Sequence, residues 1–284
     1  MKKAATRVLP GPAWAELDDV VVGARPDAEI LIVMNEPVDF DAFPRLRLVA
    51  NFSVGYDRID VEACRRRGIA VTNTPGVLDA AVADLTFALI LAVRRRVVEG
   101  DARVRAGGWG DPGFVGREVS GATIAVVGMG RIGAAVARRA EGFDMRVVGL
   151  SSRSGDLDAA LREADVVSLH TPLNDATRGL ISRDRLALLR DGTTLVNTAR
   201  GAVVDEEALV DELVSGRIDA GLDVFVHEPH VPERLRSLAN VVLTPHIASA
   251  TVETRAAMTR CVVENVLAFE RGEPLPTPVV APHP

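Results

Sequence analysis

The chain has 284 residues, of which 48% are hydrophobic, and its 33 basic and 39 acidic residues give a formal charge of −6. This length and apolar content predict a globular protein with a full core, arranged as two domains or one large one. The basic residues are scattered among acidic ones, which argues against nucleic acid as a partner.

Three features of the sequence bear on where the protein is located and on the redox state of its cysteines. The N-terminal MKKAATRVLP has no apolar run behind its lysines, so a secretory signal is not expected. The longest apolar run, AAVADLTFALILAV, contains Asp84 and stops at Arg94, which predicts a buried helix and no membrane partner. Cys64 and Cys261 lack metal-ligand spacing. We therefore expect a cytoplasmic protein with two plain thiols and no metal.

Short runs rich in Val, Ile and Leu alternate with helical segments, which predicts strand–helix–strand units on parallel sheets. The first expected strands are EILIVM, RLVAN and IAVTN. One helical stretch from about Asp79 to Arg105 then breaks the alternation and suggests a domain boundary. Six further strands follow: TIAVVG, MRVVGL, DVVSLH, TTLVNT, GLDVF and NVVLT. TVETRAAMTRCVVENVLAFERG predicts an amphipathic helix, and the tail PLPTPVVAPHP is expected to be disordered or to lie on the surface.

The motif GMGRIG stands between the strand TIAVVG and a segment of good helix formers, so the order is strand, glycine loop, helix. In that setting Gly128 permits a tight turn, Gly130 lets the backbone approach a pyrophosphate, and Gly133 allows close packing of helix and strand. The loop therefore predicts a dinucleotide-binding site.

The carboxylate that normally binds the ribose hydroxyls about 20 residues further on is missing. Ser151 lies 18 residues after Gly133, and Ser152 and Arg153 follow it. Two hydroxyls and a guanidinium favour a 2′-phosphate, which predicts NADP as the preferred cofactor. The alternative is that Arg153 is a solvated surface residue and Asp156 supplies the acid, in which case NAD is possible.

Three polar side chains follow three predicted strands: Arg200 after TTLVN, Glu228 after GLDVF and His246 after NVVLT. Each alone has an ordinary explanation as a loop or turn residue. Ligands of such sheets bind at the carboxyl ends of the strands, so the three are expected to converge there. A carboxylate anchor, a proton donor and an orienting carboxylate are what the reduction of a 2-oxo acid by hydride transfer requires.

Several long motifs then occur in a characteristic order: ANFSVGYDRID, VTNTPGVLDAAVADL, VVGMGRIG, LVNTARGAVVDEEAL, GLDVFVHEP and LTPHIASATVETR. In these motifs the chain resembles the D-isomer-specific 2-hydroxyacid dehydrogenases over nearly its whole length. SVGYD and the Ser-Ser-Arg ending are most similar to those of the glyoxylate/hydroxypyruvate reductases.

The resemblance implies an α/β fold of two Rossmann-like domains, one flavodoxin-like and one dinucleotide-binding, with parallel sheets and a cleft between them. The substrate domain would be discontinuous, comprising residues 1–78 and 252–284, and the dinucleotide-binding domain would comprise residues 79–251. The long helix from Asp79 is similar to the family's dimer element, so a homodimer is expected.

The resemblance also implies residue roles. Arg200 would bind the substrate carboxylate and carbonyl, His246 would be the acid–base catalyst, and Glu228 would hydrogen-bond His246 and favour its protonated form. The turn Ser53-Val54-Gly55 would receive the substrate carboxylate on its amides. Asp223 would hold the nicotinamide carboxamide. The remaining cofactor contacts would come from Gly128, Gly130, Arg131, Ile132, Gly133, Ser151, Ser152, Arg153, His170, Thr171, Pro172, Thr177, Thr198, Ala199, His246 and Ala248.

Together these features predict an NADPH-linked reductase of a small 2-oxo acid such as glyoxylate or hydroxypyruvate, with hydride transfer to C2 and His246 as general acid. One alternative is an NAD-dependent dehydrogenase for a bulkier acid of the hydroxyphenylpyruvate or phosphoglycerate type. Another is a non-catalytic, NAD(P)-sensing protein like the family's corepressors. Ala248 departs from the family's usual glycine, and Met34 and Asn35 are the weakest candidates for pocket lining.

Overall fold

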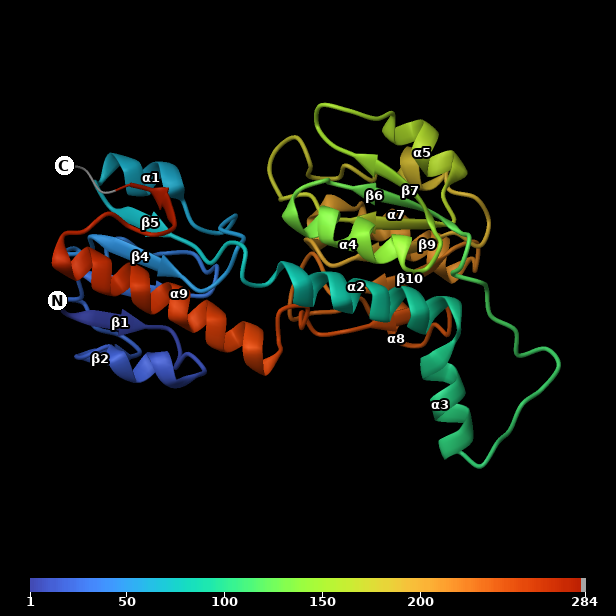
Figure 1. The fold of residues 1–284 in the computed structure, drawn as a ribbon, viewed down its shortest axis with the longest axis horizontal. Coiled ribbons are helices and arrows are strands. Elements are labelled where there is room, and N and C mark those ends of the chain that lie inside the picture. The colour runs from blue at the N-terminus through green and yellow to red at the C-terminus, as the bar shows by residue number, and fades with distance from the viewer. Residues whose placement is uncertain (282–284) are drawn as a thin grey trace. The chain divides into compact units, whose positions relative to one another are not determined.

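A computed structural model describes residues 1–281 and divides into two compact units. The first unit consists of Met1–Leu78 together with the segment that begins at Ser249, and the second is Asp79–Ala248. Each unit is built on one six-stranded sheet with helices packed against it (Figure 1). The chain thus leaves the first unit once and returns to it.

The first unit has strands in the order β12-β5-β4-β3-β1-β2. The five strands from β2 to β5 pair in parallel, and β12 pairs antiparallel with β5. Numbered along the chain, the parallel strands lie in the order 2-1-3-4-5, as in flavodoxin-like sheets. Its elements are β1 (Lys3–Ala5), η1 (Pro12–Glu16), β2 (Val20–Val22), β3 (Ile30–Val33), β4 (Leu48–Asn51), α1 (Val61–Arg66), β5 (Ala70–Thr72), α9 (Val252–Arg271) and β12 (Pro278–Val280).

The second unit has strands in the order β11-β10-β9-β8-β6-β7, all parallel. Every residue of β6, β8 and β9 is buried, as continuous apolar runs predict for the centre of a parallel sheet. Its elements are α2 (Asp79–Arg94), α3 (Val97–Arg105), β6 (Thr123–Val127), α4 (Arg131–Glu141), β7 (Arg146–Leu150), α5 (Leu157–Glu163), β8 (Val166–Leu169), α6 (Arg183–Leu186), β9 (Thr194–Asn197), η2 (Gly201–Val203), α7 (Glu206–Val214), β10 (Asp219–Leu222), α8 (Glu233–Arg236) and β11 (Val241–Leu243).

The order of these strands sets where ligands can bind. From β6 the chain moves outward to β7 and then returns to the other side of β6 to form β8. Connections therefore diverge from the carboxyl end of β6, which is the point where doubly wound sheets bind ligands. The glycine loop at Gly128–Gly133 begins directly after β6 and so lies at that point.

The predicted helix over Asp79–Arg105 is in fact two helices, and this corrects the sequence-based prediction. Arg96 adopts a left-handed backbone with φ 51°, which ends one helical path and starts another. The guanidinium of the buried Arg94 donates to the carbonyl oxygens of Glu118 (Nε, 2.9 Å) and Asp165 (3.2 Å). These bonds connect the end of α2 to the segments that precede β6 and β8, whereas α3 has no buried residue. Figure 1 shows α3 turning away from the axis of α2.

Three short strands were not predicted. β1 and β2 have only three residues each, and the proline-rich tail contributes β12. The tail was expected to be disordered or draped on the surface, yet Pro278 and Val280 pair with Thr72 and Val71. Proline is tolerated there because β12 is an edge strand.

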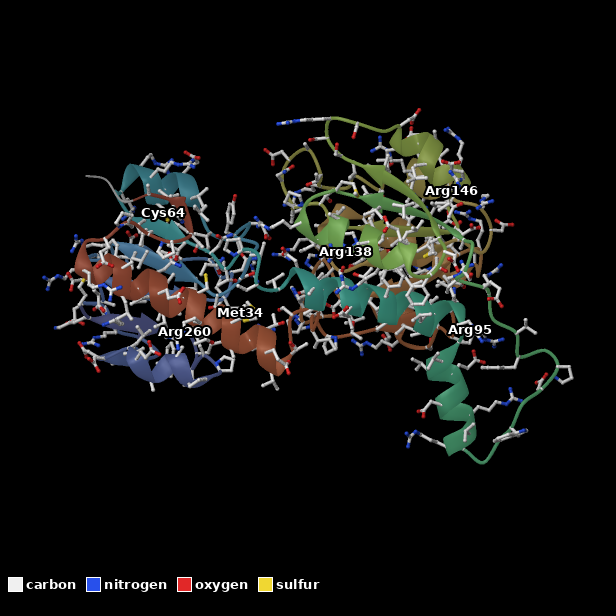
Figure 2. The ribbon with its side chains drawn as sticks, in the orientation of Figure 1. Met34, Cys64, Arg95, Arg138, Arg146 and Arg260 are labelled. Atoms are coloured by element: carbon white, nitrogen blue, oxygen red, sulfur yellow. The ribbon has the colours of Figure 1, made fainter. Side chains whose placement is uncertain are left out.

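The two cysteines are unpaired and buried, one on α1 and one on α9. Burial raises the pKa of the Cys64 thiol to about 11, and the nearby Asp60 charge acts in the same direction. Burial likewise raises the pKa of Cys261. Figure 2 shows Cys64 on the short helix of the first unit. Both side chains are therefore protonated thiols that fill core space.

Candidate active site

The glycine loop is packed as its sequence predicts. Gly128 has φ +106°, and a Cβ there would lie 2.6 Å from the carbonyl oxygen of His170. A Cβ on Gly133 would lie 2.0 Å from the carbonyl oxygen of Gly128. Only glycine fits both positions, because backbone atoms stand where the side chain would be. Strand β6, the loop and α4 therefore pack closely, and His170 lies against the loop.

The start of α4 has the properties of an anion site. Gly130 is the N-cap residue and supplies no side chain to the free N–H groups of the first turn. A Cβ on Gly130 would meet no atom within 4 Å. The nearby hydroxyl of Thr171 is buried and, among the described residues, has no hydrogen-bond partner. Unbonded amides at a helix N-terminus attract phosphate, so these residues fit the pyrophosphate of a dinucleotide.

The Ser-Ser-Arg segment lies beside this loop, since Gly128 and Met129 both donate their N–H groups to Leu150 O, at 2.9 and 3.0 Å. Ser151 and Ser154 face each other across a tight turn, with their hydroxyl oxygens 2.8 Å apart. Ser152 and Arg153 are exposed, and no carboxylate of the described chain pairs with Arg153. The turn thus presents hydroxyls and a guanidinium at the end of β7.

Asp156, the alternative ribose-binding acid, is engaged in another way. It is the N-cap residue of α5, and its Oδ1 accepts a hydrogen bond from the N–H of Ala159 at 3.0 Å. Such a cap satisfies one of the free donors of the first helical turn. The carboxylate therefore already has a structural role at the start of α5.

The three candidate catalytic residues follow three adjacent strands. Arg200 is the N-cap residue of η2 after β9, Glu228 follows β10, and His246 follows β11. Glu228 Oε2 lies 2.8 Å from His246 Nδ1, and Oε1 accepts from the Phe225 N–H at 3.0 Å. Arg200 Nη1 donates to the carbonyl of Ala199 at 2.7 Å. All three side chains lie at the carboxyl edge of the second sheet, as predicted.

Glu228 is held as a carboxylate. Burial alone raises its pKa, but the hydrogen bond from His246, the charge of His246, the Phe225 N–H and the charge of Arg200 together bring it below the usual value. A carboxylate hydrogen-bonded to Nδ1 leaves the other ring nitrogen, Nε2, to exchange a proton. The His246 side chain is 46% exposed.

Asp223 has a role that sequence reasoning missed. Its fully buried carboxylate accepts from Thr244 Oγ1 (2.7 Å), Ile247 N (2.8 Å) and Ala248 N (2.9 Å), and its carbonyl accepts from His246 N (2.9 Å). Burial raises the pKa of Asp223, and these donors oppose the rise. The contacts hold His246 in a left-handed backbone with φ 54°. The predicted contact of Asp223 with the nicotinamide carboxamide stays a prediction.

The other predicted cofactor residues surround the same edge. His170 Nε2 lies 2.7 Å from Ser168 Oγ, and burial lowers the pKa of His170 to about 4, so the ring is neutral. Thr177 Oγ1 donates to Pro172 O at 2.5 Å. Thr198 is buried against Thr86, with their hydroxyl oxygens 3.1 Å apart, and Ala199 N donates to Asn197 Oδ1 at 3.0 Å. Ala248 is buried, so its extra methyl is accommodated within the loop.

The predicted substrate residues Ser53, Val54 and Gly55 belong to the first unit, directly after β4. Met34 and Asn35 follow β3 in that same unit (Figure 2 labels Met34). Asn35 connects two other segments of the unit. Its N–H donates to Asn51 Oδ1 at 2.8 Å, and its Oδ1 accepts from Arg58 N at 3.1 Å. The structure thus brings the catalytic and glycine-loop residues together in one unit and places the SVG turn in the other.

Residues 1–281 contain neither a cluster of metal ligands nor a membrane-spanning helix. Within that range, no group of three or more His, Cys, Asp or Glu side chains is arranged to hold a metal ion. Nor does that range contain a helix with the length and apolar character that crossing a membrane requires.

Comparison with known proteins identifies the family. Residues 87–248 match the model of the D-isomer specific 2-hydroxyacid dehydrogenase NAD binding domain. The chain is 49% identical to a glyoxylate reductase of Pyrococcus furiosus over 275 residues, covering 88% of this chain and 82% of that protein. Its fold matches the TT0316 protein of Thermus thermophilus with a TM-score of 0.91 and 44% identity, covering 99% of this chain and 100% of that one. It also matches an NADPH-dependent glyoxylate/hydroxypyruvate reductase of Sinorhizobium meliloti, solved with NADP and malonate, with a TM-score of 0.87 and 35% identity over 98% and 97% of the two chains.

These matches span most of the chain and include the glycine loop and the segments that carry Arg200, Glu228 and His246. The chain therefore belongs to the D-isomer specific 2-hydroxyacid dehydrogenases and is an NAD(P)-dependent oxidoreductase that acts on the CH–OH group of its substrate and reduces a 2-oxo acid.

Proposed function

We propose that this protein is an NADPH-dependent reductase of a small 2-oxo acid, such as glyoxylate or hydroxypyruvate. The observation that carries the proposal is the His246–Glu228 pair, with 2.8 Å between Nδ1 and Oε2, at the same sheet edge as Arg200 and the uncapped N-terminus of α4. The relatives named glyoxylate reductase support the same substrate class.

In the proposed mechanism, each residue has one task. NADPH, when bound at the glycine loop, would supply a hydride for C2 of the substrate. His246 donates a proton from Nε2 to the carbonyl oxygen, while Glu228 holds Nδ1 and stabilises the imidazolium before the transfer. Arg200 binds the substrate carboxylate and carbonyl through its planar fork, and Asp223 fixes the loop that carries His246. The amides of Val54 and Gly55 receive the carboxylate from the substrate domain, which we assign to the first unit.

The cofactor preference rests on the Ser151–Arg153 segment. The exposed hydroxyls of Ser151 and Ser152 and the guanidinium of Arg153 suit a 2′-phosphate, which a carboxylate would repel. Asp156 is committed to capping α5, which weakens the alternative of an NAD-binding acid. A solved relative named NADPH-dependent supports the same preference.

The test is the rate of glyoxylate and hydroxypyruvate reduction, followed at 340 nm with NADPH and with NADH. Wild type is expected to prefer NADPH, and Arg153→Ala to lose at least about tenfold in NADPH affinity because a charge-assisted bond is removed. Arg162→Ala, a change of an exposed arginine on α5, is the matched control and should keep the preference. A wild type that prefers NADH would refute the cofactor assignment, and turnover confined to bulky 2-oxo acids would refute the substrate assignment.

We also infer a homodimer formed through α3 and the segment that follows it. Large apolar side chains are exposed there: Val97, Val98, Val104, Trp109 and Val115, with Trp109 81% exposed. Such a cluster is costly to leave in water. Light scattering is expected to give about 60 kDa, twice the 30.2 kDa of the chain. Val104→Asp should shift the mass toward the monomer, whereas Val252→Asp, at a still more exposed valine on α9, should not. A monomeric wild type would overturn this inference.

We assign the protein to the cytoplasm. Its two buried thiols are unpaired, as is usual in a reducing compartment. Fractionation of the source cells tests the assignment.

A further inference from the structure

The SVG turn of the first unit is held by its carbonyl oxygens. Asn51 Nδ2 donates to Ser53 O at 3.3 Å and to Gly55 O at 2.9 Å. Asn73 Nδ2 donates to Val54 O at 2.9 Å, and the Thr74 N–H donates to Ser53 O at 3.0 Å. Every carbonyl of the turn is therefore bonded to the unit that carries it.

This arrangement dictates where the amides point. In a planar trans peptide, the C=O of one residue and the N–H of the next point in opposite directions. Because the carbonyls of Ser53 and Val54 are held against the asparagines, the N–H groups of Val54 and Gly55 face the opposite way. Within the described part of this unit, no acceptor bonds to either N–H group. Successive amides that point the same way form a concavity for an anion.

Both asparagines are themselves locked. Asn51 is fully buried at the end of β4, and its Oδ1 accepts from the Asn35 N–H at 2.8 Å. That bond orients the side-chain amide so that Nδ2 faces the turn. Asn73 follows β5, and its backbone bonds to Thr277, with 2.6 Å between Thr277 Oγ1 and Asn73 O and 3.3 Å between Asn73 N and Thr277 O.

Thr277, which bonds to Asn73, is itself held by hydrogen bonds with Asn265. Asn265, fully buried on α9, donates from Nδ2 to Thr277 Oγ1 at 2.8 Å and accepts from Thr277 N at 3.1 Å. These two bonds hold Thr277 in the position from which its Oγ1 donates to Asn73 O. The turn is preorganised because each donor that holds it is held in turn.

We propose that Asn51 and Asn73 are positioning residues for the substrate carboxylate: they hold the carbonyls of the SVG turn inward so that its amides are presented to the anion. This inference rests on the proposed function, in which the turn receives the carboxylate. Neither asparagine contacts the substrate; both act through the peptide groups they orient. The requirement is for an N–H donor at each position, which an aspartate of the same shape does not supply.

The test compares Asn73→Asp with wild type, and Asn73→Ala serves if the aspartate variant fails to fold. The change removes the donor to Val54 O and places an acceptor against it, so the Val54–Gly55 peptide loses its orientation. We expect the KM for glyoxylate and the Kd of the carboxylate probe oxamate, measured on the NADPH-saturated protein, to rise at least about tenfold. The kcat should stay within about threefold, because binding is lost equally from ground and transition states.

Asn240→Asp is the matched control. Asn240 Nδ2 also bridges two carbonyls, those of Leu213 (3.0 Å) and Ile218 (2.8 Å), but it belongs to the second unit, which does not contain the turn. It should lower stability and leave the KM and the oxamate affinity unchanged. NADPH affinity should be unchanged in all variants.

Two results separate this inference from the proposed function. A folded Asn73→Asp or Asn73→Ala protein with wild-type KM and wild-type oxamate affinity overturns the positioning role. A wild type that reduces no small 2-oxo acid refutes the proposed function, and a weaker oxamate affinity in the Asn73 variants would still support the positioning role.

Discussion

The same added methyl group is expected to have different effects at two glycines of the loop, Gly130 and Gly133. At Gly130 the backbone has φ −79°, and a Cβ would meet no atom within 4 Å. At Gly133 a Cβ would lie 2.0 Å from the oxygen and 3.0 Å from the carbon of the Gly128 carbonyl. These are backbone atoms and cannot rotate away. Gly133→Ala should therefore damage the fold, and Gly130→Ala should damage only the binding of the cofactor.

The structure sets the size of both effects. Non-bonded heavy atoms are comfortable at about 3.5 Å, so Gly133→Ala must move α4 from the loop by more than about 1 Å. Such overpacking costs about 3 kcal/mol or more, which lowers the Tm of a unit of this size by roughly 6–12 °C. At Gly130, a cost of up to about 1 kcal/mol for alanine at an N-cap is offset by about 0.4–1 kcal/mol of lost unfolded-state freedom. Its Tm should change by no more than about 3 °C.

The assay pairs thermal melting of the cofactor-free protein with fluorescence titration of NADPH. A methyl group at Gly130 stands where the backbone approaches the pyrophosphate, and the loss of one or two charge-assisted bonds predicts at least about tenfold weaker binding. Wild-type NADPH affinity in Gly130→Ala would show that the pyrophosphate does not lie at this residue. A wild-type Tm in Gly133→Ala would refute the packing argument itself.

Three further predictions concern single side chains. His246→Asn keeps a residue that tolerates the left-handed backbone but removes the acid, so kcat for glyoxylate should fall at least about a hundredfold. Near-normal turnover would show that His246 is not the general acid. Arg200→Lys replaces a planar fork by a point charge, and kcat/KM should fall at least about tenfold in steady-state assays, whereas wild-type kcat/KM would mean that the carboxylate binds elsewhere. Burial lowers the pKa of His170 to about 4 from 6.5, so the unfolded chain takes up the proton first and stability is lost as pH falls from about 6.5 to about 4. Denaturant unfolding at pH 7.5 and 4.5 should show that wild type loses up to about 3 kcal/mol more than His170→Gln, and equal losses would contradict a neutral ring at His170.

The larger elements could be predicted from the sequence because their signals are local. All nine strands expected from apolar runs are present, and the glycine loop stands between β6 and α4 as its spacing predicts. The elements that were missed have weak local signals. β1, β2 and β12 have three residues each, and they become strands only because a longer neighbour supplies hydrogen-bond partners.

The break between α2 and α3 is also a tertiary effect. The helical pattern continues through Arg94, Arg95 and Arg96, so nothing local ends the helix. Arg94 is instead drawn into the core by the carbonyls of Glu118 and Asp165, which come from 24 and 71 residues further along the chain. The hydrogen bonds of a buried guanidinium outweigh the preference to continue one helix.

The sequence by itself determined the family, the α/β class, the glycine loop and the three strand ends that carry Arg200, Glu228 and His246. Those features depend on residues that are neighbours in the chain. Only the tertiary structure decided that Asp223 supports the His246 loop and that Asn51 and Asn73 bind the carbonyl oxygens of the SVG turn. These contacts depend on strand order and on the direction of individual peptide groups, which are set by packing between segments that lie far apart in the sequence.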